Sequence, residues 1–468
     1  MNLPPFFSVA LSLHPLRFFG CILLACASVD AHAAAERKPN IVLFVADDLS
    51  TRDTGVYGSG RVRTPQLDAL AHESLRFDRA FAASPTCVPS RAALYTGLMP
   101  FRNGAHPNHS QCREGVQSLA HHFAAAGYQV VQAGKRHFAP QSVFPWDRIA
   151  DSEVPEPGFE AKPGLRTDLD VAAVDRWLAR RTDSRPLFLI VGDHSPHVVW
   201  PERATFDPAE ADVPPNHIDT PETRRARARY YTDIEKMDSN LAALVASLRA
   251  RGLWDNTTFL FTSDQGAQWA FAKWTLYDPG ISVPLLVRWP GKTRPGTHTD
   301  ALVSLVDIVP TLLEGVGAPV PEDLDGKSFL GVVLGRTSQH RDFVFTTHTG
   351  DRQWNRSPAR SIRTERYKLI VNLAPQEVYT THMDLAKDHD GGREYWPSWE
   401  EAAKTDLLAA RILDRYRHHP PEELYDVQLD PFEQINLASD SRYTGILANL
   451  RARLAAWREE QGDRIASP

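Results

Sequence analysis

The chain has 468 residues, of which 42% are hydrophobic and 24% are charged. This composition supplies enough apolar side chains for a large buried core, so it excludes an intrinsically disordered protein. The formal net charge of -6 at pH 7 argues against a general nucleic-acid binder, and any attraction for anions must therefore be local.

The first residues have the pattern of an export signal. Arg17 precedes the apolar run 18–29, and small residues just before position 35 offer a cleavage site of the Ala-x-Ala type. We therefore expect residues 1–34 to be a signal peptide and the mature protein to be periplasmic or extracellular. Cys26 lies in a segment that loosely resembles a lipoprotein processing site, so lipoprotein anchoring is a less favoured alternative. No later apolar stretch reaches the roughly 20 residues of a transmembrane helix, and no transmembrane segment is expected.

The chain has four cysteines, but Cys21 and Cys26 lie in the expected signal peptide. Only Cys87 and Cys112 are left after cleavage, so disulfides are not expected to build the mature fold. In the oxidising surroundings of an exported protein, an idle exposed cysteine is a liability. Cys87 lies in a motif described below, and no role is predicted for Cys112.

Short apolar and β-branched runs alternate with helical stretches through the first two-thirds of the chain. This alternation is typical of an α/β fold with a large, mostly parallel sheet flanked by helices. Gly252 is a stop signal for the longest predicted helix. The predicted strands are residues 40–46, 128–133, 186–191, 257–262 and 283–288, and the predicted helices are residues 65–75, 119–126, 222–251 and 307–315.

The pattern changes after about residue 350. A charged, hairpin-like segment over 359–372 precedes a loop with several prolines and a final predicted helix over 443–461. These features indicate a smaller α+β C-terminal subdomain. We therefore expect a catalytic domain over 35–345 and a C-terminal subdomain over 346–468.

Polar side chains follow four of the predicted strands at the point where each strand ends. In an open α/β sheet, ligands bind beyond the carboxyl ends of the strands, so we expect these groups to converge. Each group alone could cap a helix or form a turn, but their repeated position at one end of the sheet favours a site. In chain order the groups are Asp47 with Asp48, Lys135 with His137, His194 with His197, and Asp264 with Gln265.

The acidic and amide members of these groups indicate a hard cation. Three aspartates and a glutamine offer only oxygen donors, which suit calcium or magnesium better than zinc. A cation held there, together with Lys135, would give an acidic protein a local pocket for an anion. The four oxygen donors are Asp47, Asp48, Asp264 and Gln265.

The most specific segment is residues 87–97, which read Cys-Val-Pro-Ser-Arg-Ala-Ala-Leu-Tyr-Thr-Gly. Pro89 suits the first turn of a helix and Gly97 suits its end. Cys87 would then lie at the helix N-terminus, where free amide groups favour an anion; the alternative is a buried or merely capping cysteine. This run resembles the signature of the sulfatase family of the alkaline-phosphatase superfamily, Cys-x-Pro-Ser-Arg followed by Thr-Gly.

The resemblance implies an alkaline-phosphatase-like fold and a modified nucleophile. A formylglycine-generating enzyme would oxidise Cys87 to 3-oxoalanine, also called formylglycine, and the hydrate of this aldehyde would be the nucleophile. Arg91 would hold and polarise it. The cation would be calcium, with magnesium less favoured.

The resemblance also implies ligands and sulfate contacts elsewhere in the chain. His197 is the preferred general acid, with His137 oriented toward the nucleophile. Gln265 stands where the family more usually has Asn. The implied metal ligands are Asp47, Asp48, Asp264, Gln265 and modified Cys87, and the implied sulfate contacts are Lys135, His137, His197 and Lys273.

Within the family, the chain resembles the sulfamidase, or heparan N-sulfatase, branch most. The segments 134–137 and 194–197, and the nine-residue spacing between Asp264 and Lys273, support this resemblance. It implies a sulfuric ester hydrolase that removes a sulfate ester or sulfamate from a sulfated sugar, such as a heparan-type glucosamine in glycosaminoglycan degradation, or from another sulfated small molecule. Loop residues would line the substrate pocket; the candidates are His194, His348, Asp351 and Arg360.

Two other functions stay open at this point. Relatives in the same superfamily hydrolyse phosphonate monoesters or phosphodiesters at a similar formylglycine site, and a comparison of sulfate and phosphate ester turnover separates the two activities. The other alternative is a catalytically silent glycan-binding homologue. Mass spectrometry of the peptide that contains Cys87 tests it, because a silent homologue would keep the unmodified thiol.

Overall fold

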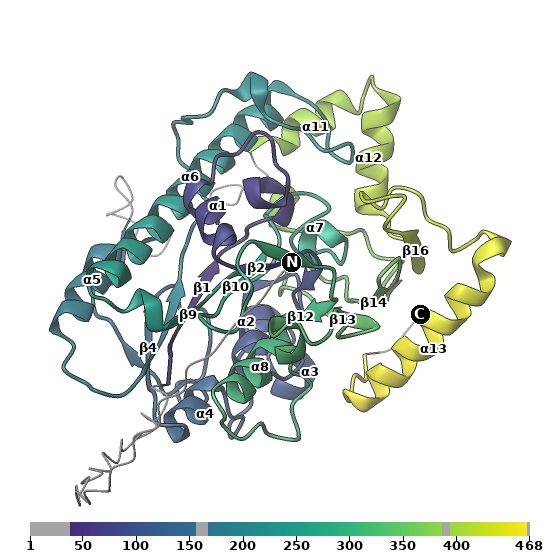
Figure 1. The fold of residues 1–468 in the computed structure, drawn as a ribbon. Coiled ribbons are helices and arrows are strands. Elements are labelled where there is room, and N and C mark those ends of the chain that lie inside the picture. The colour runs from purple at the N-terminus through teal and green to yellow at the C-terminus, as the bar shows by residue number, and fades with distance from the viewer. Residues whose placement is uncertain (1–37, 156–166, 386–393, 466–468) are drawn as a thin grey trace, which may run out of the picture. The chain divides into compact units, whose positions relative to one another are not determined.

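A computed structural model describes residues 38–155, 167–385 and 394–465 (Figure 1). The predicted signal peptide and Cys26 lie outside these residues. The described residues from Lys38 onward belong to one compact unit. Among them, no helix combines the length and the apolar character that crossing a lipid bilayer requires.

The centre of this unit is an eight-stranded sheet with the strand order β11-β2-β10-β9-β1-β8-β4-β5. The five strands β9, β1, β8, β4 and β5 are parallel to one another. β10 is antiparallel to both β9 and β2, and β11 is parallel to β2. The prediction of an α/β fold with a mostly parallel sheet is therefore confirmed. The strands are β1 (Asn40–Ala46), β2 (Leu75–Phe77), β4 (Gln129–Gly134), β5 (Asp147–Arg148), β8 (Leu187–Gly192), β9 (Thr257–Ser263), β10 (Leu285–Arg288) and β11 (Thr297–Thr299).

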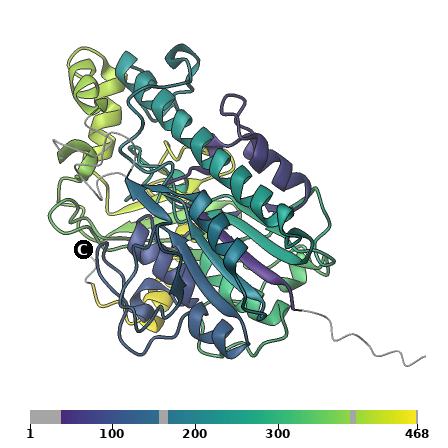
Figure 2. The same cartoon turned by 90° about the vertical axis from the view of Figure 1, so that its left-hand side faces the viewer.

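Helices cover both faces of the sheet (Figure 2). Alternate side chains of β1 point to opposite faces, as in any strand, and from Ile41 to Ala46 both sets are apolar and fully buried. Phe44 packs on the first face, and Leu43 on the second. This explains why β1 reads as a continuous apolar run. The helices of the first face are α1 (Pro65–His72), α5 (Val171–Arg180) and α6 (Pro221–Ala250), and those of the second are α2 (Cys87–Thr96), α4 (Leu119–Ala125) and α8 (Ile308–Gly315).

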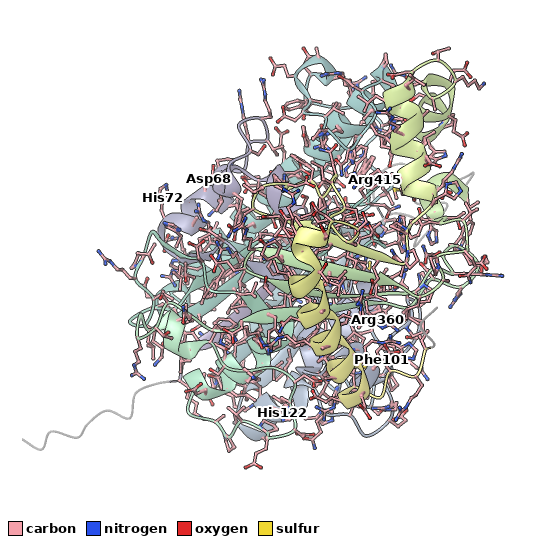
Figure 3. All side chains as sticks on the ribbon, turned by 90° about the vertical axis from the view of Figure 1, so that its right-hand side faces the viewer. Asp68, His72, Phe101, His122, Arg360 and Arg415 are labelled. Atoms are coloured by element: carbon pink, nitrogen blue, oxygen red, sulfur yellow. The ribbon has the colours of Figure 1, made fainter. Side chains whose placement is uncertain are left out.

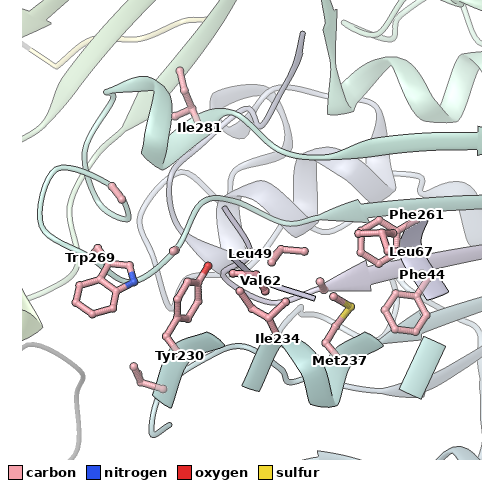
Figure 4. Packing of buried hydrophobic residues seen from close by; sticks show 14 of the residues in the cluster. Phe44, Leu49, Val62, Leu67, Tyr230, Ile234, Met237, Phe261, Trp269 and Ile281 are labelled. Carbon is pink, nitrogen blue, oxygen red and sulfur yellow. The ribbon is translucent and has the colours of Figure 1, made fainter. Parts of the chain in front are cut away.

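The first face is filled largely by α6. Ile234 and Met237 of this helix are fully buried beside Phe44 and Phe261 (Figure 4). The two phenylalanine rings stack with their centroids 5.5 Å apart. Burying each side chain of this kind stabilises the fold by about 1.5–3 kcal/mol. This apolar layer therefore fixes the positions of β1 and β9 relative to α6.

One predicted helix is too long. The helix predicted over 65–75 ends at His72, and Leu75 instead begins β2, which pairs with β10 and β11. The apolar residues Leu75 and Phe77 are buried in that sheet. The helical spacing of apolar residues continues past His72 in the sequence. Pairing with the distant strands β10 and β11 instead makes Leu75–Phe77 a strand.

The C-terminal part forms a separate antiparallel sheet in the order β13-β14-β15-β16. Helix α13 (Thr444–Glu460) packs against it, and Leu450 and Leu454 of the helix belong to the same hydrophobic cluster as the sheet residues Ile362 and Leu369. The proposed division between residues 345 and 346 stays a prediction, and β13 lies across it. The strands are β13 (Phe343–His348), β14 (Ala359–Thr364), β15 (Tyr367–Asn372) and β16 (Glu422–Asp426).

Short elements complete the described residues. Two further pairs of strands form small sheets, β3 with β12 and β6 with β7. These strands are β3 (Ala80–Phe81), β6 (Glu153–Pro155), β7 (Thr167–Leu169) and β12 (Val303–Ser304), and the remaining α-helices are α3 (Pro100–Asn103), α7 (Asp278–Ile281), α9 (Leu330–Val333), α10 (His382–Leu385), α11 (Trp396–Ala402) and α12 (Leu407–Arg417).

Candidate active site

The carboxyl ends of β1 and β9 bring acidic side chains together. β1 and β9 are parallel neighbours in which Ala46 faces Ser263, so the residues that follow each strand meet at one edge. The backbone amide of Asp48 donates a hydrogen bond to Asp264 Oδ1 at 3.2 Å. The Gln265 side chain reaches back and its Nε2 donates to Asp48 Oδ1. All four acidic and amide side chains of the predicted cation site, including Asp47, are fully buried here.

Cys87 begins helix α2 and lies against this group. Its side chain is only 1% exposed, and its Sγ is 3.8 Å from Asp47 Oδ1. Gln265 Nε2 donates to the same sulfur at 3.1 Å. The helix ends at Gly97, which adopts the left-handed conformation with φ of 69°, as the sequence predicts. Ligand atoms of Asp47, Asp48, Cys87 and His197 all lie within 4.8 Å of one another.

Arg91 lies one turn further along α2, where it is fully buried. Its Nε donates to Asp264 Oδ2 at 2.8 Å, and its Nη2 is 3.5 Å from Asp47 Oδ1. Neither Nη1 nor Nη2 has a hydrogen-bond partner among the described residues. Nη2 is thus in ion-pair range of Asp47 without forming a hydrogen bond. A buried guanidinium is costly to leave unsatisfied, so a further oxygen acceptor near these two nitrogens would be stabilised.

Two lysines and a histidine face the same carboxylates. Lys135, at the end of β4, forms an ion pair with Asp47. Lys273 Nζ donates to Asp48 Oδ2 at 2.7 Å and to Gln268 Oε1 at 3.1 Å. His197, which follows β8, places its Nε2 3.6 Å from Asp48 Oδ2. Side chains that follow the four strands β1, β4, β8 and β9 thus meet at one point, together with Lys273 from a loop.

The electrostatics of the cluster are balanced. Three carboxylates face the cations of Arg91, Lys135 and Lys273. Burial disfavours the charged form of Asp47, but the neighbouring Lys135, His197 and Arg91 outweigh burial and hold its pKa well below the ordinary value. Burial instead raises the pKa of Asp264 to about 7, with Arg91 opposing and the other two aspartates adding to the rise.

The residues of the cluster fit a bound divalent cation. Gln265 Oε1 is buried without a hydrogen-bond partner among the described residues, and exchange of the amide oxygen and nitrogen positions would turn this oxygen toward Asp48 and Cys87. Converging carboxylate and amide oxygens are the ligands that calcium and magnesium prefer. A dication added to three carboxylates and three cationic side chains leaves an excess of positive charge, which suits an anionic substrate.

The thiol of Cys87 is a poor nucleophile as it stands. Burial raises its pKa to about 12, although Lys273 and Lys135 oppose the rise. The side chain is therefore protonated at neutral pH, and only the thiolate reacts readily.

The remaining histidines differ in their surroundings. Burial, Lys135 and His109 together hold the pKa of His137 well below its usual value, so this ring is neutral at pH 7. Its Nδ1 is buried without a hydrogen-bond partner among the described residues. His194 is tied up by protein partners, because its Nε2 is 3.0 Å from Glu153 Oε1 and its Nδ1 is 2.9 Å from Thr167 Oγ1.

Three candidate substrate contacts from the C-terminal part make contacts within the protein. Arg360 is fully buried; its Nε donates to Asp463 Oδ2 at 2.7 Å and its Nη1 to His348 O at 2.6 Å. Figure 3 shows it next to Phe101, whose ring centroid is 4.7 Å from the guanidinium carbon. His348 Nε2 pairs with Asn355 Oδ1 at 2.9 Å. Asp351 is also fully buried, and its side chain holds Asn108 and His109.

Sequence reasoning missed several residues of this region. Asn108 Oδ1 accepts a hydrogen bond from the backbone amide of Val88 at 3.3 Å, and the ring of His109 lies 5.3 Å from that of His137. Gln268 binds Lys273. None of these residues follows a strand or belongs to the Cys87 motif, so no local signal in the sequence marks them.

Comparison with known proteins identifies relatives over nearly all of the chain. The profile described as Sulfatase matches residues 39–318, more than half of the sequence. The profile described as N-sulphoglucosamine sulphohydrolase, C-terminal, matches residues 266–418.

Two curated relatives and one solved structure illustrate the likeness. An ulvan-active sulfatase of Formosa agariphila is 33% identical over 94% of this chain and 83% of that protein. The N-sulphoglucosamine sulphohydrolase of Homo sapiens is 31% identical over 91% of each chain. A structure solved in complex with its substrate D-glucosamine-2-N,6-O-disulfate has the same fold, with a TM-score of 0.67 and 19% identity over 92% of this chain and 99% of that one.

Proposed function

The chain belongs to the sulfatase family, and from that premise we propose a formylglycine- and calcium-dependent enzyme that removes sulfate from glucosamine-type units of a sulfated glycan. The observation that carries the proposal is the position of Cys87. It starts a helix with its sulfur beside Asp47 and Gln265, and buried Arg91, whose Nη atoms have no hydrogen-bond partner among the described residues, lies one turn away. The likeness to N-sulphoglucosamine sulphohydrolase over 91% of both chains supports the glucosamine unit.

The cation would be held by Asp47, Asp48, Asp264, Gln265 and modified Cys87. When bound, it supplies positive charge that lowers the pKa of a hydroxyl group and neutralises the oxygens of a sulfuryl group. Gln265 keeps the amide oxygen of the more usual Asn on a longer side chain. Its flexible extra carbon still lets the amide reach Asp48.

Formylglycine at position 87 supplies a hydroxyl nucleophile for sulfur when its aldehyde is hydrated. Arg91 orients that group through its two Nη atoms, which have no hydrogen-bond partner among the described residues. His137 is neutral because burial and Lys135 lower its pKa, so its ring can accept a proton on the nucleophile side. Arg91 on α2 thus aligns the nucleophile, and His137, which follows β4, deprotonates it.

The other cationic residues act on the substrate side. Lys135 and Lys273 are held at the cluster by carboxylates, and their charges stabilise the sulfuryl oxygens as the bond to the leaving group lengthens. His197 lies at the rim of the cluster with 28% of its side chain exposed. It is therefore placed to donate a proton to a departing alcohol or amine, whereas His194 is engaged by Glu153 and Thr167.

Maturation and location belong to the same proposal. A formylglycine-generating enzyme would modify Cys87 before the site closes, because the folded side chain is only 1% exposed. The apolar run that begins the chain would direct the protein to the periplasm or the extracellular space.

The test uses full-length protein produced together with a formylglycine-generating enzyme, with conversion of Cys87 verified by mass spectrometry. Heparan-derived disaccharides with one sulfate each, an ulvan oligosaccharide and a phosphonate monoester are compared as substrates. We expect the highest kcat/KM on a disaccharide with N-sulfated or O-sulfated glucosamine. Preferred turnover of the phosphonate, or no sulfate release by converted protein, would contradict the proposal.

Calcium is tested by removal and return. Treatment with a chelator should abolish turnover, and calcium should restore it more fully than magnesium at equal concentration, since calcium tolerates an irregular set of oxygen ligands. Full activity after complete metal removal would rule the cation out.

A further inference from the structure

Asp351 connects the C-terminal part of the chain to the candidate active site. It lies in the loop between β13 and β14 and is fully buried. Its Oδ1 is 2.8 Å from His109 Nδ1, and its Oδ2 accepts from Asn108 Nδ2 at 2.9 Å. Trp274 Nε1 donates to Oδ2 at a longer 3.4 Å. His382 Nδ1 lies 3.9 Å from the same Oδ2, so one carboxylate contacts four side chains from three other segments.

Each of the three hydrogen-bonded side chains contacts, or is adjacent in sequence to, a residue at the candidate active site. Asn108 accepts from the backbone amide of Val88, the neighbour of Cys87 in the first turn of α2. The ring of His109 packs 5.3 Å from that of His137. Trp274 follows Lys273 directly and has a positive φ of 68°, a conformation that a bulky residue adopts only when its surroundings impose it.

A direct contact between Asp351 and substrate does not fit these observations. The carboxylate already accepts three hydrogen bonds at two oxygens, and no part of the residue is exposed. Its hydrogen bonds to His109 and Asn108 outweigh burial and hold its pKa below the ordinary range. The group is therefore a buried acceptor whose partners are protein side chains.

We propose that Asp351 is a positioning residue: it orients Asn108 and His109, and through them the first turn of α2 and His137. The proposal rests on the proposed sulfatase function. It assigns Asp351 to alignment of the nucleophile and its base, in place of the substrate contact that the sequence predicted.

The central variant is Asp351→Asn. An amide keeps the shape but turns one acceptor oxygen into a donor. If this donor faces Asn108 and Trp274, their hydrogen bonds are lost; if it faces His109, Nδ1 must give up its proton and accept, which changes the tautomer of the ring. We expect kcat to fall about 10- to 100-fold, in the range seen when outer-shell partners of catalytic groups are removed. KM for the same sulfated disaccharide should change less than about 3-fold, since ground-state binding is untouched.

Asp307→Asn is the matched control. Asp307 is equally buried and binds Arg341 and His340, and among the described residues none of its hydrogen bonds or ion pairs reaches a member of the cluster. The control should lower stability without lowering the kcat of the folded protein. A rise in KM at unchanged kcat in Asp351→Asn would mean direct substrate contact and would overturn the proposal.

Double variants test the route of the effect. Asp351→Asn combined with His109→Ala, or with Asn108→Ala, should lose little more kcat than the more damaging single change, because both changes break one path. The single variants His109→Ala and Asn108→Ala should each lower kcat with KM unchanged, and they test the route even if Asp351→Asn fails to fold. Losses that multiply in both combinations would show that Asp351 acts independently of these residues.

A measurement independent of turnover separates this inference from the proposed function. Hydrogen–deuterium exchange of peptides covering residues 105–112 and 268–277 should become faster in Asp351→Asn and stay unchanged in Asp307→Asn. Unchanged exchange in both segments would overturn the positioning role. A wild-type protein that carries formylglycine but releases no sulfate would instead refute the proposed function and leave the exchange result standing.

Discussion

Two regions of this molecule bury clusters of charged side chains, and they are built differently. In the cluster at the C-terminal sheet, Asp278 accepts from Lys368 Nζ at 2.8 Å and from Arg363 Nη2 at 3.0 Å, and Lys368 also lies 2.5 Å from Glu433 Oε1. Opposite charges alternate there. At the end of β1, by contrast, the ligand atoms of Asp47, Asp48, Cys87 and His197 lie within 4.8 Å of one another.

The difference shows which feature of a buried charge points to function. The cluster at Asp278 holds the pKa of that carboxyl well below its usual range, because Arg363 and Lys368 outweigh burial. In the cluster at Asp47, Arg91 and Gln265 keep buried polar atoms without a hydrogen-bond partner among the described residues. Glu433 Oε1 in the cluster at Asp278 also lacks a hydrogen-bond partner among the described residues. The difference between the two clusters is therefore the convergence of metal-ligating side chains at Asp47, rather than burial of charge or an unsatisfied atom as such.

The largest expected effect on turnover comes from a substitution in the cluster at Asp47. Cys87→Ala should lower turnover of a sulfated disaccharide at least about 1,000-fold, as removal of a covalent nucleophile does. The melting temperature should move by less than about 3 °C, since little volume is lost. Cys112→Ala is the control, because Cys112 is also buried and should keep full turnover. Comparable activity in the two variants would exclude a nucleophile at position 87.

Breaking the second region should affect stability and not chemistry. Lys368→Met removes the fully buried ammonium group that pairs with both Asp278 and Glu433. Loss of one member of a buried ion-pair network lowers the free energy of unfolding by about 3–5 kcal/mol. Urea unfolding measures this loss. The kcat of the folded variant should match the wild type. A large fall in kcat with unchanged stability would reverse the roles assigned to the two regions.

The histidines after β8 sharpen the comparison within the first region. His197→Ala should lower kcat about 100-fold through loss of the general acid. His194→Ala should lower it less than about 10-fold, because His194 contacts Glu153 and Thr167. Steady-state kinetics on one substrate rank the two variants, and a larger loss in His194→Ala would exchange their roles.

The smallest expected effect concerns His348, which is fully buried at the end of β13. Burial lowers its pKa to about 4, whereas the unfolded chain protonates this ring near its ordinary pKa of about 6.5. Between these values the unfolded state binds the extra proton, so the free energy of unfolding decreases as pH falls from 6.5 to 4, by up to about 1.4 kcal/mol per pH unit. His348→Gln should flatten this slope in urea titrations. An unchanged slope would show that other groups cause it.

Much of the fold and part of the site could be predicted from local signals. The strands that precede Asp47 and Asp264, the long helix α6 and the start of α2 at Cys87 all follow from apolar runs and from turn residues such as Gly97 and Gly252. The parallel arrangement then predicts that strand ends meet. Leu75 was assigned to a helix because the pattern of its neighbours is helical, and only its pairing with β10 places it in a strand.

The sequence by itself determined the class of fold, the helix that presents Cys87 and the acidic residues beside it, because each of these is encoded within a few neighbouring residues. Only the tertiary structure decided that Arg360 pairs with Asp463 and that Asp351 holds His109, a residue 242 positions away. Such contacts depend on how distant segments pack against one another. No local pattern carries that information, since the same residue types occur equally well on a solvated surface.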